Sequence, residues 1–234
     1  MKTIVVGDIH GCFAEFEEIL RRTELDEDGD RLILIGDIID RGPDSRLVMN
    51  RVWELQKKMG DRLVYLMGNH EDLAAEALRT GDRHHWDANG GAKTRRSFYR
   101  AGDRFDRYFS YISERPLYCE TEAYICAHAA VSPEGPEHTD RQTFLWDRNI
   151  AFGSPYNGKL LIYGHTPMKG VILRDETGRG ETICAGSRLH LPRTGSICID
   201  TGCVYGHSLS ALVIADGMLR VEAVEYGSVE ARRR

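Results

Sequence analysis

No apolar run in the sequence approaches the roughly 20 residues that a membrane-spanning helix requires. The first residues also lack the long apolar stretch and small-residue cleavage site of a secretory signal, and a polar motif begins already at Gly7. With 41% apolar and 29% charged residues, the composition is that of a soluble globular protein. The sequence therefore predicts a cytoplasmic protein with no membrane partner.

The six cysteines form no Cys-x-x-Cys pair and no zinc-finger spacing. In a cytoplasmic protein such thiols are expected to be small buried apolar residues, not disulfides or metal ligands. The net charge of −5 gives no general basic face, which a nucleic-acid binder needs in order to release counterions. We therefore expect no nucleic-acid partner, although a locally positive pocket remains compatible with this charge.

The first third of the chain repeats one arrangement three times: a short β-branched run, a polar turn and a helical pattern. Strands are predicted at residues 3–6, 31–35 and 63–67, and helices at 13–22, at 46–59 and from the turn around residue 69 onward. Successive strand–loop–helix units imply parallel strands joined by right-handed crossovers. The carboxyl ends of such strands form the edge of the sheet where sites are built.

The β pattern returns in the second half, at residues 124–127, 160–163, 196–199, 208–214 and 219–224. This half reads as antiparallel, which predicts two packed sheets with helices outside. Residues 80–115 break the rhythm, since they are rich in Arg, Asp, Gly and aromatics. We interpret them as a partly helical insertion in a single domain that spans residues 1–234.

The polar turns that follow the strands offer metal-binding atoms. The candidate ligands are Asp8, His10, Asp37, Asn69, His128 and His165. This mixture of oxygen and imidazole donors suits manganese, with iron, zinc, cobalt or nickel as alternatives. It fits neither a soft-metal site, which would be all sulfur, nor a calcium site, which would be all oxygen.

Six ligands exceed the need of one tetrahedral ion and suit two ions that share a carboxylate. Two ions about 3.5–4 Å apart polarise phosphoryl oxygens and lower the pKa of a bridging water toward neutrality. Asp37, the central carboxylate of the series, is the expected bridge. Asp8 and His10 are assigned to the first ion, and Asn69, His128 and His165 to the second.

Other side chains near these turns suit the remaining needs of attack at phosphorus. A guanidinium fork matches two phosphate oxygens at once; Arg41 is the first candidate and Arg148 the second, with Asn69 as a further phosphate contact. His70 adjoins a ligand but is spare. Asp40 can orient its imidazole and keep it charged, as a general acid requires.

Five segments match, in order, the signature of the calcineurin-like metallophosphoesterases. They are Gly7-Asp8-Ile9-His10-Gly11, Gly36-Asp37-Ile38-Ile39-Asp40-Arg41-Gly42, Gly68-Asn69-His70-Glu71, His128-Ala129 and Gly164-His165-Thr166. Within this family the chain resembles serine/threonine phosphoprotein phosphatases and bacterial symmetrical diadenosine tetraphosphate hydrolases, over most of its length. The resemblance implies a four-layer αββα sandwich of two mixed sheets, two divalent metal ions and His70 paired with Asp40 as proton donor. It also implies a phosphoric ester hydrolase in which a metal-bridging hydroxide attacks directly.

Two positions point to different substrates within that family. Met67 stands where protein phosphatases usually carry Arg, which favours a tetraphosphatase-like pocket. Asp40 is the protein-phosphatase choice, where tetraphosphatases typically have a small apolar residue. The balance predicts a phosphomonoesterase of the serine/threonine protein phosphatase type acting on phosphorylated protein. The alternative is a symmetrical diadenosine tetraphosphate hydrolase acting on a nucleotide.

A basic run in the insertion has two interpretations. Lys93, Arg95, Arg96 and Arg100 form either a solvated helix face or an electrostatic funnel that recruits phosphorylated substrates to the metals.

Overall fold

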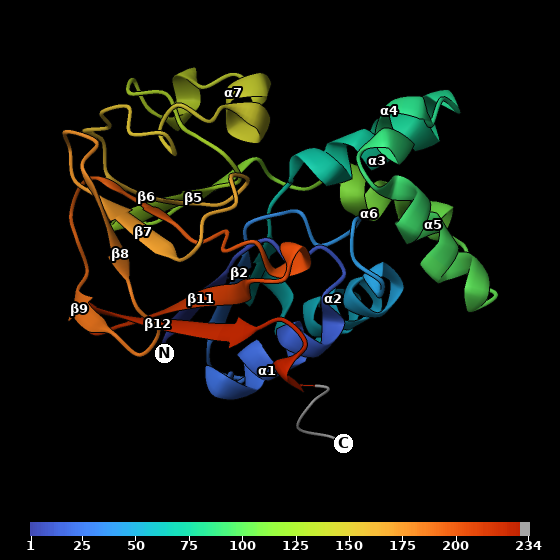
Figure 1. Cartoon of the computed structure of the whole chain (residues 1–234), viewed down its shortest axis with the longest axis horizontal. Helices are drawn as coiled ribbons and strands as arrows, with labels where there is room; N and C mark the ends of the chain where they lie inside the picture. Colours follow the sequence, from blue (N-terminus) through green and yellow to red (C-terminus); the bar gives the residue numbers. More distant parts are fainter. Residues whose placement is uncertain (230–234) are drawn as a thin grey trace.

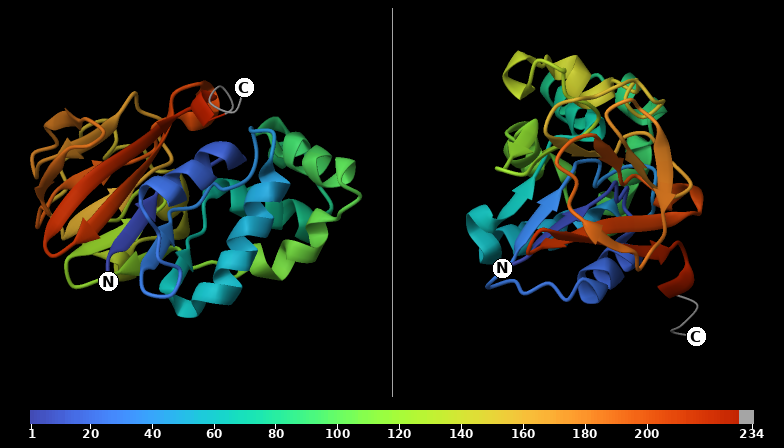
Figure 2. Two further views of the ribbon diagram at one scale, coloured as in Figure 1. Left: turned by 90° about the horizontal axis from the view of Figure 1, so that it is seen from below. Right: turned by 90° about the vertical axis from the view of Figure 1, so that its left-hand side faces the viewer.

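Two mixed six-stranded sheets pack face to face in the computed structural model, which describes residues 1–229 (Figures 1 and 2). The first sheet has the order β3-β2-β1-β11-β12-β9. Its strands are β1 (Thr3–Val6), β2 (Arg31–Leu34), β3 (Leu63–Tyr65), β9 (Arg188–His190), β11 (Ser208–Ala215) and β12 (Met218–Glu225). The second has the order β4-β5-β6-β10-β7-β8. Its strands are β4 (Tyr118–Glu120), β5 (Tyr124–Ala127), β6 (Leu160–Tyr163), β7 (Val171–Arg174), β8 (Gly180–Ile183) and β10 (Ser196–Cys198).

Strand direction follows the prediction in the first third of the chain and departs from it later. β1, β2 and β3 are parallel, as predicted. The expectation that the second half is antiparallel is wrong for three strands, because β5, β6 and β10 are mutually parallel. Parallel neighbours need a crossover of a dozen or more residues, and the long segments after β5 and after β6 provide these crossovers.

Alternation along the central strands distributes their apolar side chains between two cores. In β1, Ile4 and Val6 face the helices, whereas Val5 faces the second sheet. In β2, Leu34 and Ile33 divide in the same way. Strands buried on both faces read as continuous apolar runs, which explains why their sequences show no polar alternation.

Helices α1 (Phe13–Arg22) and α2 (Ser45–Met59) cover the outer face of the first sheet (Figure 1). Phe16 and Ile19 of α1, and Val52 of α2, are fully buried there. One short helix, α7 (Arg141–Trp146), and the irregular chain on either side of it pack on the outer face of the second sheet. The fold class predicted from the sequence, two mixed sheets with helices outside, is confirmed.

The segment expected to be a partly helical insertion is mostly helical. α3 (Asn69–Thr80) leads into α4 (His84–Ala88), α5 (Gly91–Arg100) and α6 (Phe109–Ser113), which stand beside the sandwich (Figures 1 and 2). Short 3-10 turns occur at η1 (Gly60–Arg62), η2 (Phe105–Tyr108), η3 (Pro136–His138) and η4 (Cys203–Tyr205). Among residues 1–229 we find no helix that combines the length and apolar character needed to cross a bilayer.

Candidate metal centre

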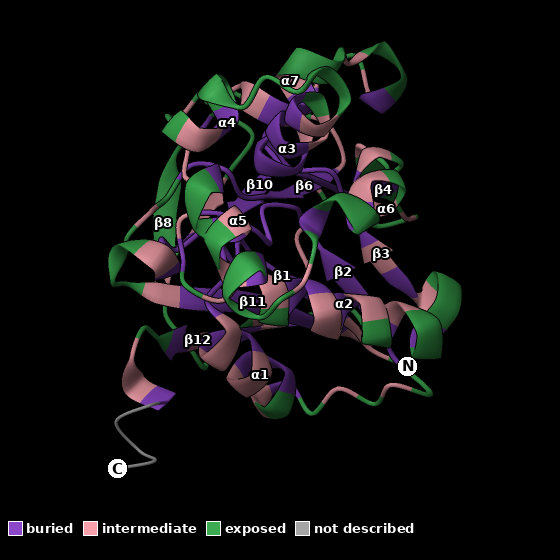
Figure 3. Cartoon of the chain, turned by 90° about the vertical axis from the view of Figure 1, so that its right-hand side faces the viewer, coloured by how far each residue is buried: buried purple, intermediate pink, exposed green. Residues whose placement is uncertain are grey.

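The six candidate ligands converge where the carboxyl ends of the parallel strands of both sheets meet. All six are at most 5% exposed. Figure 3 shows the buried zone around β6, β10 and α3, with exposed surface on α4, α5 and α7 around it. Two hydrogen bonds join the sheets here: His128 Nδ1 to the Ile35 carbonyl, at 2.9 Å, and the His165 backbone N–H to Asp8 Oδ2, at 3.1 Å.

Asp37 occupies the centre of the group. Its Oδ2 lies 3.5 Å from His10 Nε2 and 3.5 Å from His128 Nε2, and its Oδ1 accepts the His70 backbone N–H at 2.9 Å. Two sets of three side chains have ligand atoms within 4.8 Å of one another: His10, Asp37, His70, and Asp37, His128, His165. Asp37 belongs to both sets, which is the position expected of a bridging carboxylate.

Asn69 and Asp8 complete the arrangement from two sides. Asn69 Oδ1 lies 2.9 Å from His128 Nε2 and 2.9 Å from His165 Nδ1, so the predicted ligands of the second ion touch one another. Asp8 lies outside both sets of three, and its carboxylate accepts the His165 backbone N–H. Burial raises the pKa of Asp8, and the negative charges of Asp200 and Asp37 raise it further.

The imidazoles are held in the state that a metal requires. Burial lowers the pKa of His10 and of His165 to about 3, so both rings are neutral near pH 7. His10 Nδ1–H donates to the Ile39 carbonyl at 2.8 Å, which leaves Nε2 facing the centre. A backbone bond at Nδ1 that orients Nε2 in this way is typical of ligating histidines.

The carboxylate and an unpartnered nitrogen support the same interpretation. Burial alone would raise the pKa of Asp37, but His128, His70 and His10 around it lower the pKa below its usual value. His165 Nε2 is buried without a hydrogen-bond partner in the described structure, and an unsatisfied buried polar atom is costly. The neutral imidazoles, ionised carboxylate and amide oxygen therefore fit divalent ions of the manganese, iron and zinc group.

Backbone strain is concentrated at this centre. Of the seven non-glycine residues with positive φ in residues 1–229, five belong to the predicted site: His10, Asp37, Asp40, Arg41 and His165. Such conformations are sparsely populated and persist only where the surrounding structure enforces them. Gly68 allows a close approach between the loops after β2 and β3, since a Cβ there would lie 2.3 Å from Asp37 Oδ1.

His70 and Asp40 form a buried pair next to the candidate ligands. His70 Nδ1 donates to Asp40 Oδ2 at 2.8 Å, and both side chains are fully buried. Burial alone would lower the pKa of His70, but Asp37 and Asp40 raise it above its ordinary value. Within residues 1–229, His70 Nε2 has no hydrogen-bond partner, and it lies 3.9 Å from Asp37 Oδ2. Nε2 of His70 thus faces the centre, and the raised pKa of the ring favours its protonated form.

The helical segment fixes Asp40 from the other side. Trp86 Nε1 donates to Asp40 Oδ2 at 2.8 Å, and Thr94 Oγ1 donates to Asp40 Oδ1 at 2.6 Å. Trp86 is not among the residues that the sequence marked as candidates for the site. Its role in holding Asp40 is set by tertiary structure, since the two residues are 46 positions apart.

Of the predicted phosphate-binding arginines, Arg41 touches the centre and Arg148 lies near it. Arg41 Nη1 is 2.6 Å from His10 Nε2, and its guanidinium lies 5.8 Å from the Tyr205 ring centroid. Arg148 is exposed in the loop after α7. Its charge is felt at the centre, since burial, His128 and Arg148 all act to lower the pKa of His165.

Two buried carboxylates support the centre and were not predicted. Asp200 follows β10. Burial, together with the negative charge of Asp37, raises the pKa of Asp200 to about 7. The polar turn after a parallel strand was the available signal for Asp200. Glu71 accepts the backbone N–H groups of Asp37 at 2.7 Å and of Gly68 at 3.0 Å, which ties the loop after β2 to the loop after β3.

Comparison with known proteins places this centre in a family. The sequence profile of the calcineurin-like phosphoesterases matches residues 1–211, which include all six candidate ligands. The chain belongs to this family. The calcineurin-like phosphoesterases are metal-dependent hydrolases with a dinuclear metal centre, which agrees with the two sets of ligands that share Asp37.

Two curated relatives within the calcineurin-like phosphoesterases carry different activities. The symmetrical bis(5'-nucleosyl)-tetraphosphatase of Vibrio parahaemolyticus is 35% identical over 61% of this chain and 49% of that protein. Serine/threonine-protein phosphatase 1 of Salmonella typhimurium is 29% identical over 70% of this chain and 78% of that protein. The chain thus spans about half the length of the curated tetraphosphatases that it matches.

Solved structures agree on the fold. A putative diadenosine tetraphosphatase superposes with a TM-score of 0.67 at 21% identity, covering 97% of this chain and 94% of that one. A serine/threonine phosphatase of Saccharomyces cerevisiae superposes with a TM-score of 0.63 at 14% identity, covering 96% of this chain and 80% of that one.

Proposed function

We propose that this calcineurin-like phosphoesterase is a dinuclear metal-dependent phosphomonoesterase of the serine/threonine protein phosphatase type. The observation that carries the proposal is the buried pair of His70 and Asp40, joined at 2.8 Å, with the free Nε2 of His70 facing the candidate metal centre. This arrangement supplies a proton to a leaving group, and a proton donor matters most for substrates whose leaving group is poor.

The donor chemistry around the centre fits two divalent ions such as manganese. Asp8, His10 and Asp37 would hold the first ion, and Asp37, Asn69, His128 and His165 the second. Ions held by these residues would polarise the phosphoryl oxygens and lower the pKa of a bound water. The protein supplies the remaining needs, which are to bind the phosphate, align the ester and protonate the departing oxygen.

Each of these tasks falls to a side chain at the rim of the centre. Arg41 Nη1 lies 2.6 Å from His10 Nε2, so its guanidinium fork would be available to phosphate oxygens beside the residues that would hold the first ion. Arg148 approaches from the exposed loop after α7, on the His165 side. Asn69 contributes a further phosphate contact through its side-chain amide. His70 then delivers its Nε2 proton to the leaving oxygen while Asp40 holds the ring in place.

The leaving group distinguishes a phosphomonoester from a dinucleoside polyphosphate. Serine leaves as an alkoxide, which resembles hydroxide, the base of water with a pKa of about 15.7. A nucleoside diphosphate leaves through a phosphate oxygen whose pKa is about 6 and needs no proton near neutral pH. A fully buried and multiply bonded Asp40 that orients a proton donor is therefore of greater use to a monoesterase.

A symmetrical tetraphosphatase is the second candidate, and two observations favour it. Met67 is fully buried in an apolar core, so this position adds no phosphate contact. The rings of His85 and Trp146 lie parallel at 6.3 Å between centroids, with Trp146 also 6.0 Å from His165, which offers aromatic surface beside the centre. The similarity to the Vibrio tetraphosphatase supports the same alternative.

A parallel assay with manganese decides between the two. Phosphoserine peptide, p-nitrophenyl phosphate and diadenosine tetraphosphate are offered to the purified protein at equal concentration. The proposal predicts release of inorganic phosphate from the first two substrates. Formation of two ADP from diadenosine tetraphosphate, with negligible release from the monoesters, would establish the tetraphosphatase instead.

A further inference from the structure

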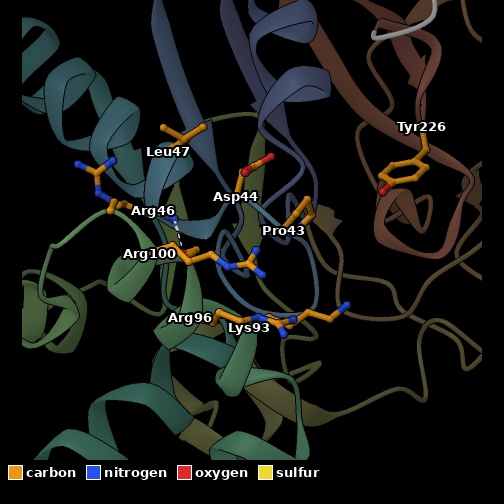
Figure 4. A pocket seen from close by; sticks show the side chains of 10 residues that line it. Pro43, Asp44, Arg46, Leu47, Lys93, Arg96, Arg100 and Tyr226 are labelled. Atoms are coloured by element: carbon orange, nitrogen blue, oxygen red, sulfur yellow. Dashed lines mark hydrogen bonds between the residues drawn. The ribbon is translucent and has the colours of Figure 1, made fainter.

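A basic pocket of about 470 Å³ lies next to the loop that carries Asp40 and Arg41, between the start of α2 and α5 (Figure 4). Lys93, Arg96 and Arg100 line it from α5, Arg46 and Asp44 line it from the start of α2, and Tyr226 lines it from the turn after β12. None of the candidate metal ligands lines this pocket, so it is a separate feature of the molecule.

The charge in the pocket comes from one exposed face of α5. Lys93, Arg96 and Arg100 recur at helical spacing on that face, whereas Thr94 and Phe98 are buried on the opposite face. Across residues 1–229, neither Arg96 nor Arg100 forms an ion pair. Arg46 is paired with Asp103 at 2.9 Å and so contributes less. With cations in excess over the single carboxylate of Asp44, the pocket attracts an anion.

The sequence left two interpretations of the basic run, a solvated helix face and an electrostatic funnel, and the four residues divide in the structure. Arg95 forms an ion pair with Asp87 and does not line the pocket. Lys93, Arg96 and Arg100 line the pocket together (Figure 4). A defined pocket favours binding of one charged group over general attraction of any anion.

Helix α5 is fixed to the Asp40–Arg41 loop by three hydrogen bonds. Thr94 Oγ1 donates to Asp40 Oδ1 at 2.6 Å and accepts the Asp40 backbone N–H at 2.9 Å, and Lys93 Nζ donates to the Arg41 carbonyl at 2.6 Å. Gly90 packs so closely that a Cβ there would lie 2.9 Å from the Arg41 backbone nitrogen. The position of the pocket relative to Arg41 is thus set by the same contacts that position Asp40.

The pocket lies within reach of a short stretch of extended peptide. Asp44, which lines the pocket, follows Arg41 by three residues, so their Cα atoms are at most about 11 Å apart. An extended phosphopeptide lying across Arg41 would therefore reach the pocket within about three residues. Pro43 and Leu47 add apolar surface to the lining, which suits the methylene stem of a glutamate.

We infer that this pocket binds an acidic side chain of a phosphopeptide substrate, about two to four residues from the phosphorylated serine or threonine. The inference rests on the proposed function and adds a sequence preference to it. Phosphopeptides with a glutamate at this distance are preferred over otherwise identical peptides with glutamine, through a lower KM and an unchanged kcat.

The kinetic test compares two phosphoserine peptides that differ only by Glu or Gln three residues from the phosphoserine, on either side in turn. The wild type should show a kcat/KM ratio of about two- to fivefold in favour of Glu on one side, and Arg96→Ala with Arg100→Ala should reduce that ratio to about one. Activity on p-nitrophenyl phosphate should stay unchanged. Arg179→Ala with Arg193→Ala removes the same charge from exposed positions elsewhere and should keep the wild-type ratio.

A binding measurement separates this inference from the proposed function. Fluorescence anisotropy of a labelled, unphosphorylated Glu-rich peptide needs no turnover. Binding to the wild type and to the Arg179/Arg193 control, lost in the Arg96/Arg100 variant, supports the pocket even if no phosphopeptide is hydrolysed. Equal binding to all three proteins, or a Glu preference that survives in the Arg96/Arg100 variant, overturns the inference. Binding of diadenosine tetraphosphate but not of the peptide at these arginines would also overturn it.

Discussion

Trp86 donates its indole N–H to the Oδ2 of Asp40 at 2.8 Å, and so ties the helical segment beside the sandwich to the carboxylate that orients His70. The same oxygen accepts from His70, so the positions of the two rings depend on each other. This relationship makes the helical segment part of the arrangement around the candidate metal centre and not only a cover for it.

Trp86→Phe is expected to keep the packing and remove this hydrogen bond. Loss of one buried hydrogen bond costs about 1 kcal/mol of unfolding free energy, and the looser Asp40 should slow phosphoserine hydrolysis severalfold. Denaturant unfolding and kcat measure the two effects. Trp53→Phe is the matched control, because Trp53 packs edge-on against Tyr108 and Tyr111 away from Asp40, so this change should leave kcat unchanged. A Trp86→Phe enzyme with wild-type kcat would show that Asp40 does not need the indole.

The metal content should depend on the shared carboxylate. We expect two ions per chain after manganese loading, measured by elemental analysis. Asp37→Asn is predicted to lose both ions, whereas His128→Ala loses one, because only Asp37 belongs to both sets of ligands. Bound metal stabilises the folded state by about 2.7 kcal/mol at a free concentration of 100 Kd, so chelation should lower Tm. A single ion in the wild type, retained after Asp37→Asn, would contradict the bridging assignment.

The two arginines should contribute unequally to phosphate binding. A hydrogen bond to a charged group is worth about 1.5–3 kcal/mol, so Arg41→Ala is expected to reduce kcat/KM by about 10–100-fold. Arg148 is exposed and approaches from a loop, so Arg148→Ala should cost less. Arg41→Lys keeps the charge without the fork and should fall between wild type and Arg41→Ala. Equal activity of Arg41→Ala and wild type would remove Arg41 from the site.

A glycine substitution tests whether close contact between loops positions Asp37. Gly68→Ala would bring a Cβ to within 2.3 Å of Asp37 Oδ1 and is expected to reduce metal content. Gly81→Ala, at the other end of α3, is the matched control, since Gly81 has φ +82° and no atom within 4 Å of its Cβ position. That change should cost about 1–2 kcal/mol of stability with metal content intact. Full metal occupancy in Gly68→Ala would show that the loop tolerates displacement.

Much of the centre could be predicted from the sequence because its signals are local. Each candidate ligand lies in the turn that follows a short apolar strand. The strands at residues 3–6, 124–127 and 160–163 have the predicted bounds. Parallel strands bring such turns to one edge whatever lies between them in the sequence. The buried pair of His70 and Asp40 was predictable for the same reason, since both residues flank candidate ligands.

The features that the sequence did not reveal depend on contacts between distant segments. Strands β4, β8 and β9 are three or four residues long and largely exposed, so they carry no apolar run. The parallel direction of β5, β6 and β10 depends on crossovers whose path the sequence does not show. The bond from Trp86 to Asp40 and the ion pair from Arg95 to Asp87 join residues whose types alone suggest packing and a basic face.

The substitution His70→Asn tests the central claim most directly, with phosphoserine peptide and p-nitrophenyl phosphate as paired substrates and metal content measured in the same samples. General acid catalysis contributes about 10²–10⁴-fold, and a nitrophenolate leaves readily without a proton. The variant is therefore predicted to keep both ions and to lose far more activity on phosphoserine than on p-nitrophenyl phosphate. Asp40→Asn should show the same pattern with smaller losses. Equal losses on the two substrates, with both ions retained, would contradict the assignment of His70 as the proton donor.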